Sequence, residues 1–181
     1  MTFDDYIKSE GDTALLKIKA VVLDIDGVLT DGTFGYDGSG NEIKFFHARD
    51  GHGIKMAMRA GILVGVLSGR SSGANRQRAA ELGLSFIYEN AKDKQAVFSR
   101  LLDENKLNAD EILYIGDDVV DIPVFRKAGV AATVADAPPY LDEFCAFRTT
   151  LPGGHGAVRE LIEHLLGKQN KWNDLMRKYT V

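Results

Sequence analysis

Two carboxylates stand two residues apart where an apolar segment of the sequence ends. Asp24 and Asp26 follow the apolar run 18–23, and Gly27 comes next. Residues i and i+2 of a strand share one face, and glycine permits a sharp turn, so both side chains can reach one small volume. Roughly 4 kcal/mol of repulsion between carboxylates about 4 Å apart calls for a cation or a shared proton. This tetrapeptide alone leaves two alternatives, a metal site and an ordinary surface turn.

Three further polar segments favour the metal site. Ser68 and Gly69 follow the apolar run 63–67, and Lys94 precedes an amphipathic helical pattern. A serine hydroxyl and the amides of a glycine turn can bind phosphate oxygens, and a lysine neutralises their charge. The last segment follows the apolar run 112–115 and carries three carboxylates, Asp117, Asp118 and Asp121. Because Mg²⁺ takes carboxylate, water and substrate oxygens, the ordered set predicts a phosphoryl-transfer site.

Short apolar runs that alternate with helical patterns must position these residues. The alternation predicts an α/β fold, a doubly wound parallel sheet covered by helices on both faces. Strands are expected at 18–23, 63–67, 86–88, 112–115 and 130–134, with a short one near Phe147. Ligands bind at the carboxyl ends of the strands in such sheets, and all four polar segments fall there. No Gly-x-Gly-x-x-Gly follows the first strand, which argues against a dinucleotide-binding domain.

Helices are expected between these strands. Asp50 is a candidate N-cap for a helix that runs to Ala60, and Ser72 is one for a helix that ends before Gly83. Three further helices are expected at 92–105, near Pro123 and at 158–166.

The four segments and their order resemble the motifs of the haloacid dehalogenase superfamily of phosphohydrolases. The resemblance is closer to one small subfamily, whose members remove phosphate from 3-deoxy-D-manno-octulosonate (KDO) 8-phosphate. It is carried by the segments 24–32 (DIDGVLTDG), 46–51 (FHARDG), 116–118 (GDD), 134–137 (VADA) and 153–160 (GGHGAVRE). We therefore expect a phosphatase domain over 18–166, an N-terminal extension over 1–17 and a C-terminal tail over 167–181.

The resemblance implies a division of labour among the aspartates. Asp24 would attack phosphorus and form an aspartyl-phosphate, while Asp26 would protonate the leaving oxygen and then activate water. Magnesium would be held by the carboxylates of Asp24 and Asp117 and by the backbone carbonyl of Asp26. Asp118 and Asp121 would support these ligands. Splitting the reaction through a covalent intermediate gives two easier steps.

Ser68 and Lys94 would hold the phosphoryl group, by the same resemblance. The expected substrate-binding residues are Thr30, Arg49, Gly69, Arg70, Gly154 and Arg159. Arginine suits the carboxylate of a sugar acid because its planar fork pairs with both oxygens. A salt bridge at a helix end is the alternative for Arg49 and Arg159, and Arg49 could also act in a neighbour's pocket.

The segment 33–46 departs from the alternation and is typical of a small β-hairpin insertion with its turn over 37–40. The spacing of the motifs leaves no room for a cap domain. A covalent intermediate favours a closed site, so we expect a homo-oligomer, a tetramer by resemblance, whose hairpins join. The joined hairpins would bury Phe34, Tyr36, Phe45 and Phe46. The alternative is a hairpin folded against its own domain.

Three other functions stay open for the sequence alone. The same chemistry could act on a nine-carbon sialic-type sugar acid 9-phosphate, since the pocket and not the motifs selects the substrate. A non-catalytic oligomerisation module is a second alternative, against which the intact motif residues argue. A phospho-accepting signalling domain is the third, but it has no need of an acid two residues after its nucleophile, where Asp26 stands.

Composition excludes some partners. The 181 residues carry a net charge of −4 with scattered basic residues, so nothing suggests a nucleic-acid partner. No apolar run approaches the roughly 20 residues of a membrane helix, and the amino end lacks a signal-peptide core. The lone Cys145 excludes a disulfide within the chain and fits a reducing compartment. We expect a cytoplasmic enzyme acting on a small molecule.

Overall fold

A parallel sheet of six strands organises the computed structural model, which describes residues 12–180. The strand order is β5-β4-β1-β6-β7-β8, so the first strand of the sheet along the chain is central. The strands are β1 (Ala20–Leu23), β4 (Leu63–Leu67), β5 (Phe86–Tyr88), β6 (Ile112–Gly116), β7 (Val130–Thr133) and β8 (Phe147–Arg148). This sheet confirms the predicted fold class and places every expected strand within about two residues.

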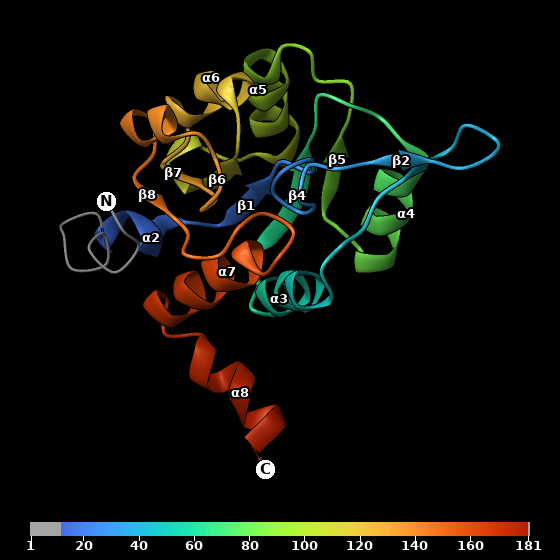
Figure 1. Ribbon diagram of the computed structural model, residues 1–181. Coiled ribbons are helices and arrows are strands. Elements are labelled where there is room, and N and C mark those ends of the chain that lie inside the picture. The colour runs from blue at the N-terminus through green and yellow to red at the C-terminus, as the bar shows by residue number, and fades with distance from the viewer. Residues whose placement is uncertain (1–11, 181) are drawn as a thin grey trace.

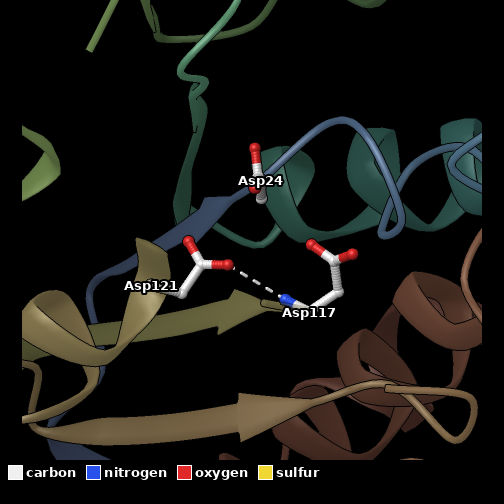
Figure 2. A group of neighbouring side chains, drawn as sticks. All are labelled: Asp24, Asp117 and Asp121. Carbon is white, nitrogen blue, oxygen red and sulfur yellow. Dashed lines mark hydrogen bonds between the residues drawn. The ribbon is translucent and has the colours of Figure 1, made fainter. Parts of the chain in front are cut away.

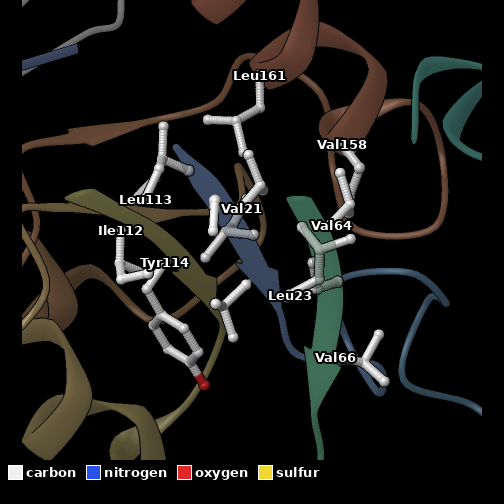
Figure 3. Close-up of a cluster of buried hydrophobic side chains, with 14 of the residues drawn as sticks. Val21, Leu23, Val64, Val66, Ile112, Leu113, Tyr114, Val158 and Leu161 are labelled. Carbon is white, nitrogen blue, oxygen red and sulfur yellow. The ribbon is translucent and has the colours of Figure 1, made fainter. Parts of the chain in front are cut away.

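Helices cover both faces of the sheet. On one face lie α3 (Ala48–Arg59) and α7 (Ala157–Lys168), and on the other lie α5 (Lys94–Asn105) and α6 (Ile122–Phe125) (Figure 1). The register pairs Val21 of β1 with Val64 and Leu113, and this row packs beside Val158 and Leu161 of α7 (Figure 3).

The opposite face of the sheet carries an aromatic cluster. The Tyr114 ring of β6 makes edge contacts with Phe98 of α5 and Phe125 of α6, at centroid distances of 6.5 and 5.7 Å. All three side chains are buried. The apolar runs of the sequence therefore form the buried strands, and the polar segments that follow them lie at the strand ends.

The helix boundaries agree with the sequence at one predicted cap and differ at another. Ser72 caps α4 (Gly73–Leu82), since its side chain accepts from the Asn75 amide, and Gly83 ends this helix in the left-handed region as predicted. The prediction that Asp50 caps its own helix is wrong. The N-cap of α3 is His47, three residues before Asp50, and the Asp50 carboxylate accepts from backbone amides at the start of α7 instead.

The predicted hairpin is present and extends from the domain (Figure 1). Its strands β2 (Gly35–Tyr36) and β3 (Glu42–Ile43) are antiparallel and shorter than expected. Its exposed apolar residues are Phe34, Tyr36, Ile43 and Phe45. Phe46 is partly buried and packs against the core of its own domain. Between β1 and β4 the chain forms this hairpin and α3, with no cap domain, as predicted.

Two helices near the ends of the chain pack on the domain. Leu15 of α2 (Asp12–Lys17) is buried, and α8 (Trp172–Thr180) reaches back so that Arg59 donates to the Tyr179 hydroxyl at 2.9 Å. Three short 3₁₀ segments complete the fold, η1 (Ala109–Glu111), η2 (Val119–Asp121) and η3 (Pro139–Glu143). Within residues 12–180, no helix combines the length and apolar character needed to cross a membrane. The part of the expected N-terminal extension that precedes Asp12 lies outside the described residues.

Candidate active site

Three aspartates from two central strand ends converge on one point (Figure 2). Asp24 follows β1 directly, Asp117 follows β6, and Asp121 closes η2. Each offers a carboxylate oxygen, and these oxygens lie within 4.8 Å of one another. Adjacent parallel strands end at the same edge of the sheet, which explains how residues over 90 positions apart meet here.

A buried lysine joins two of the three aspartates. Lys94 is the first residue of α5, and its Nζ donates to Asp24 Oδ2 at 2.5 Å and to Asp121 Oδ1 at 2.7 Å. The second oxygen of Asp24 accepts from the Ile25 amide at 2.7 Å. One buried ammonium therefore offsets part of the charge of the carboxylate cluster and fixes the orientation of Asp24.

Asp121 is fully engaged by the protein. Its Oδ1 also accepts from the Tyr114 hydroxyl at 2.5 Å, and its Oδ2 accepts from the amides of Asp117 and Asp118 at 3.0 and 3.2 Å. These bonds hold the turn after β6 in place. The arrangement favours a supporting role for Asp121, and the roles of Asp24 and Asp117 as cation ligands stay predictions.

Gly27 allows Asp117 to come close to the loop after β1. Its φ of +82° is in the left-handed region, and a Cβ built on it would lie 1.9 Å from Asp117 Oδ2. Only glycine leaves this space to the carboxylate. The Asp26-Gly27 pair in the sequence thus has a packing reason besides the turn.

The charge of the cluster is not balanced by Lys94 alone. Burial, followed by the charges of Asp24 and Asp121, raises the pKa of Asp117 to about 8. Burial also raises the pKa of Asp24 to about 7, against the opposing effect of Lys94. Such shifts mean that the folded chain disfavours full ionisation of these oxygens, and a divalent cation would favour it. An all-oxygen donor set of this kind fits a hard cation such as Mg²⁺.

A pocket of about 270 Å³ opens over the cluster. The residues lining it come from all four predicted segments and are Asp24, Asp26, Gly32, Ser68, Gly69, Arg70, Lys94, Asp117, Asp118 and Val120. Ser68 is buried, and its hydroxyl accepts from the Arg70 amide at 3.3 Å. The structure therefore brings together the residues that the sequence suggested for the nucleophile, the acid, the metal and the phosphate.

Other predicted substrate contacts lie elsewhere in the single chain. Arg49 and Arg159 line a second pocket of about 600 Å³, together with His47 and His155. The Thr30 hydroxyl is buried in its own loop, donating to the Ile25 carbonyl at 3.4 Å.

Gly154 packs against the backbone of that same loop, and its amide donates to the Val28 carbonyl at 2.9 Å. A part for Thr30, Arg49, Gly154 and Arg159 in binding substrate stays a prediction.

Sequence reasoning missed two hairpin residues that touch the site. Lys44 Nζ lies 2.5 Å from Asp26 Oδ1 and 3.1 Å from Glu42 Oε1. Glu42 Oε2 in turn accepts from Arg70 Nη2 at 2.5 Å. The available signal was the i, i+2 spacing of Glu42 and Lys44, which puts both on one face of an extended segment.

Known proteins are similar to this chain in fold and in sequence. The haloacid dehalogenase-like hydrolase family matches residues 83–161. The KDO 8-phosphate phosphatase of Haemophilus influenzae is 44% identical over 157 residues, which make up 87% of this chain and 87% of that protein. A cobalt-bound structure of the phosphatase from H. influenzae has a TM-score of 0.85 and 43% identity, and covers 88% of this chain and 93% of that one.

A third similar structure carries ligands. It is the KDO 8-phosphate phosphatase of Moraxella catarrhalis in complex with magnesium, phosphate and KDO. Its TM-score is 0.91 at 31% identity, and the match covers 98% of this chain and 99% of that one.

The strand-end aspartates on a doubly wound sheet, together with these matches, define the class: the chain belongs to the haloacid dehalogenase-like hydrolases. Within that class it falls in the family of the KDO 8-phosphate phosphatases, and it is a phosphoric monoester hydrolase. Membership in a family of enzymes argues against the non-catalytic alternatives.

Proposed function

We propose that this protein hydrolyses KDO 8-phosphate to KDO and inorganic phosphate, with magnesium as cofactor. One observation carries the proposal: Lys94 bridges Asp24 and Asp121 beneath a pocket that also presents Asp26, Ser68 and Asp117. The identity of the substrate rests on the relatives, since the matched proteins from H. influenzae and M. catarrhalis are phosphatases of this sugar acid phosphate. A cytoplasmic location stays a prediction.

Asp24 is the proposed nucleophile of the first step. Its carboxylate oxygen attacks phosphorus and forms a P–O bond, while the bond between phosphorus and the sugar oxygen breaks. The leaving oxygen takes a proton from the Asp26 carboxyl group and departs as the alcohol. Lys94 and the Ser68 hydroxyl hold the phosphoryl oxygens, which lowers the repulsion between the carboxylate and an anionic ester.

Asp26 reverses its role in the second step. Its carboxylate takes a proton from water as the water oxygen attacks phosphorus of the aspartyl-phosphate. The bond between phosphorus and the Asp24 oxygen breaks, which restores the carboxylate and releases phosphate. The use of one group first as acid and then as base requires that it lie beside the pocket, and Asp26 lines it.

Asp24, Asp117 and the backbone carbonyl of Asp26 would hold the magnesium ion. When bound, the ion supplies positive charge that polarises the phosphoryl group and offsets the nucleophile's own charge. The oxygen-only donors and the raised pKa values of Asp24 and Asp117 support this assignment. Asp121 keeps the turn that carries Asp117 in position through its bonds to two backbone amides.

A homo-oligomer would complete the pocket. At about 270 Å³ the pocket of one chain is smaller than the roughly 300–1,000 Å³ usual for ligand sites. The hairpin exposes Phe34, Tyr36, Ile43 and Phe45 to solvent in the single chain. Exposed apolar residues that lie close together mark interaction sites. We propose that the protein is a tetramer in which hairpins from other copies cover these residues. The same hairpins would bring further side chains to the sugar.

Rates of phosphate release from purified esters test this function. We expect the eight-carbon KDO 8-phosphate to be the best substrate, and a nine-carbon sugar acid 9-phosphate to be turned over more slowly. Removal of metal with a chelator should abolish the activity, and added Mg²⁺ should restore it. A preference for the nine-carbon ester would overturn the substrate assignment, and activity without any divalent ion would overturn the cofactor assignment.

A further inference from the structure

One charged side chain of the hairpin, Lys44, contacts Asp26, the proposed catalytic acid. Lys44 stands next to the strand β3, and its side chain is 0% exposed although it belongs to a projecting hairpin. Its Nζ lies 2.5 Å from Asp26 Oδ1. Because Lys44 contacts Oδ1, the proton that is transferred would be carried by Oδ2, which Arg70 Nε approaches only to 3.7 Å.

A second acidic group holds this ammonium in place. Glu42 Oε1 lies 3.1 Å from Lys44 Nζ, and Glu42 Oε2 accepts from Arg70 Nη2 at 2.5 Å. Arg70 also lies 3.7 Å from Asp26 Oδ2 through its Nε, and its guanidinium stacks 4.2 Å from the centre of the Phe34 ring. These ion pairs therefore form one network that links the hairpin to the pocket. Its members are Asp26, Lys44, Glu42 and Arg70.

Lys44 lies outside the pocket itself. Asp26 and Arg70 are among the described residues that line the pocket, whereas Lys44 is not. A buried side chain in this place contacts the acid and has no access to a ligand there. Any effect on the chemistry must therefore pass through the Asp26 carboxylate.

We infer that Lys44 is a positioning residue, which holds the Asp26 carboxyl group in the orientation that delivers its proton to the leaving oxygen. The inference rests on the proposed function, because it assumes that Asp26 is the acid. Glu42 fixes the ammonium, so the hairpin contributes to catalysis within its own chain, apart from its proposed part in assembly. The competing explanation is that Lys44 only anchors the hairpin.

The leaving group separates these two explanations. A sugar alkoxide needs a proton to leave, whereas p-nitrophenolate is stable enough to leave without one. We therefore compare kcat/KM of wild-type protein and Lys44→Met on KDO 8-phosphate and on p-nitrophenyl phosphate. Since general acids contribute about 10²–10⁴-fold, the loss on the sugar ester should exceed the loss on the aryl ester by at least about tenfold. Equal losses on both esters, or no loss, would overturn the inference.

Two further variants serve as a control and as a second test. Lys19→Met is the matched control, because Lys19 pairs with Glu111 at 2.5 Å at the opposite end of β1, and it should leave both rates unchanged. Glu42→Gln keeps the ammonium but weakens its anchor, and it should show the same selective loss at smaller size. If Lys44→Met does not fold, Glu42→Gln decides, and equal losses on its two esters reject the inference.

Failure of the proposed function would look different. Wild-type protein that does not hydrolyse KDO 8-phosphate would overturn that function, and the inference with it. Wild-type protein that hydrolyses both esters, with equal losses in Lys44→Met, would overturn the inference alone. Asp26→Asn should reproduce the selectivity of Lys44→Met, since both variants impair one proton transfer.

Discussion

The Asp50 carboxylate accepts a hydrogen bond of 2.7 Å from the backbone amide of Arg159, which lies 109 positions further along the chain. A second bond, of 3.2 Å, comes from the Gly156 amide. Asp50 belongs to α3, and both amides belong to the start of α7, where helical N–H groups have no partner within the helix. One buried carboxylate therefore fastens the two helices that cover the same face of the sheet.

Replacement of this carboxylate should destabilise the fold. Asp50→Ala leaves two amides of α7 without their acceptor, so we expect the free energy of unfolding to fall by about 1–3 kcal/mol. Urea denaturation measures it. Asp174→Ala, which removes an exposed carboxylate from α8, should stay within about 0.5 kcal/mol of wild type. Similar losses in both variants would contradict the assigned role of Asp50.

Loss of the proposed nucleophile should stop turnover without unfolding the protein. In Asp24→Asn we expect phosphate release to fall to the background rate, because the amide cannot form the aspartyl-phosphate. Circular dichroism should show a retained fold.

Asp26→Asn should lower turnover of the sugar ester by about 10²–10⁴-fold. Full steady-state activity in either variant would show that the mechanism is wrong.

Gly27 should be needed for metal binding. In Gly27→Ala the added Cβ would collide with Asp117 Oδ2, so this carboxylate must leave its present position in the cluster. We expect Mg²⁺ affinity, measured by calorimetry, to weaken at least about tenfold, or roughly 1.4 kcal/mol. Gly38→Ala in the hairpin turn is the control, since a Cβ there meets nothing within 4 Å. Unchanged affinity in Gly27→Ala would remove Asp117 from the ligand set.

The stabilisation of the protein by Mg²⁺ should grow with pH. The pKa values of Asp24 and Asp117 are raised from 3.8 to about 7 and about 8, chiefly by burial. Between about pH 4 and 8 these two carboxyl groups therefore bind more protons in the folded metal-free protein than in the unfolded chain, and their contribution to stability falls as pH rises. Because the metal requires ionised carboxylates, its shift of the melting temperature should be larger at pH 8 than at pH 6. A shift independent of pH would contradict the assignment.

The hairpin should form the interface between the subunits of the proposed oligomer. The Phe45 side chain is 81% exposed in the single chain, so Phe45→Glu should add a charge to the proposed interface and yield smaller species in gel filtration with light scattering. Leu16→Glu changes another exposed apolar residue, in α2, and should leave the assembly intact. Wild-type protein that is monomeric at micromolar concentration would refute the proposed assembly.

The strands and the central site could be predicted because their signals are local. Apolar runs of four or five residues mark strands buried on both faces, and the polar residues just after them can only lie at the strand ends. Asp24, Ser68 and Asp117 meet for this reason. Lys94 joins them because α5 follows β5 and begins near the carboxyl ends of the strands.

The features that the sequence did not indicate depend on contacts between residues that are distant in the sequence. Asp50 looked like a cap for its own helix, and only the packing of α3 on α7 gives its carboxylate a better partner. Sequence analysis assigned no role to Lys44, because its burial depends on its contact with Asp26, 18 positions earlier in the chain. Arg49 and Arg159 are in motifs near the site in sequence, yet they line a different pocket.

The order of the strands has a consequence for how the chain matures during synthesis. Strand β1 lies between β4 and β6, and the loop after it packs so closely on Gly153 that a Cβ there would lie 1.8 Å from the Gly27 carbonyl. A ribosome delivers β1 long before β6 or Gly153. Asp24, the proposed nucleophile, therefore lacks its neighbours on β6 and the support of Gly153 until most of the chain has been synthesised.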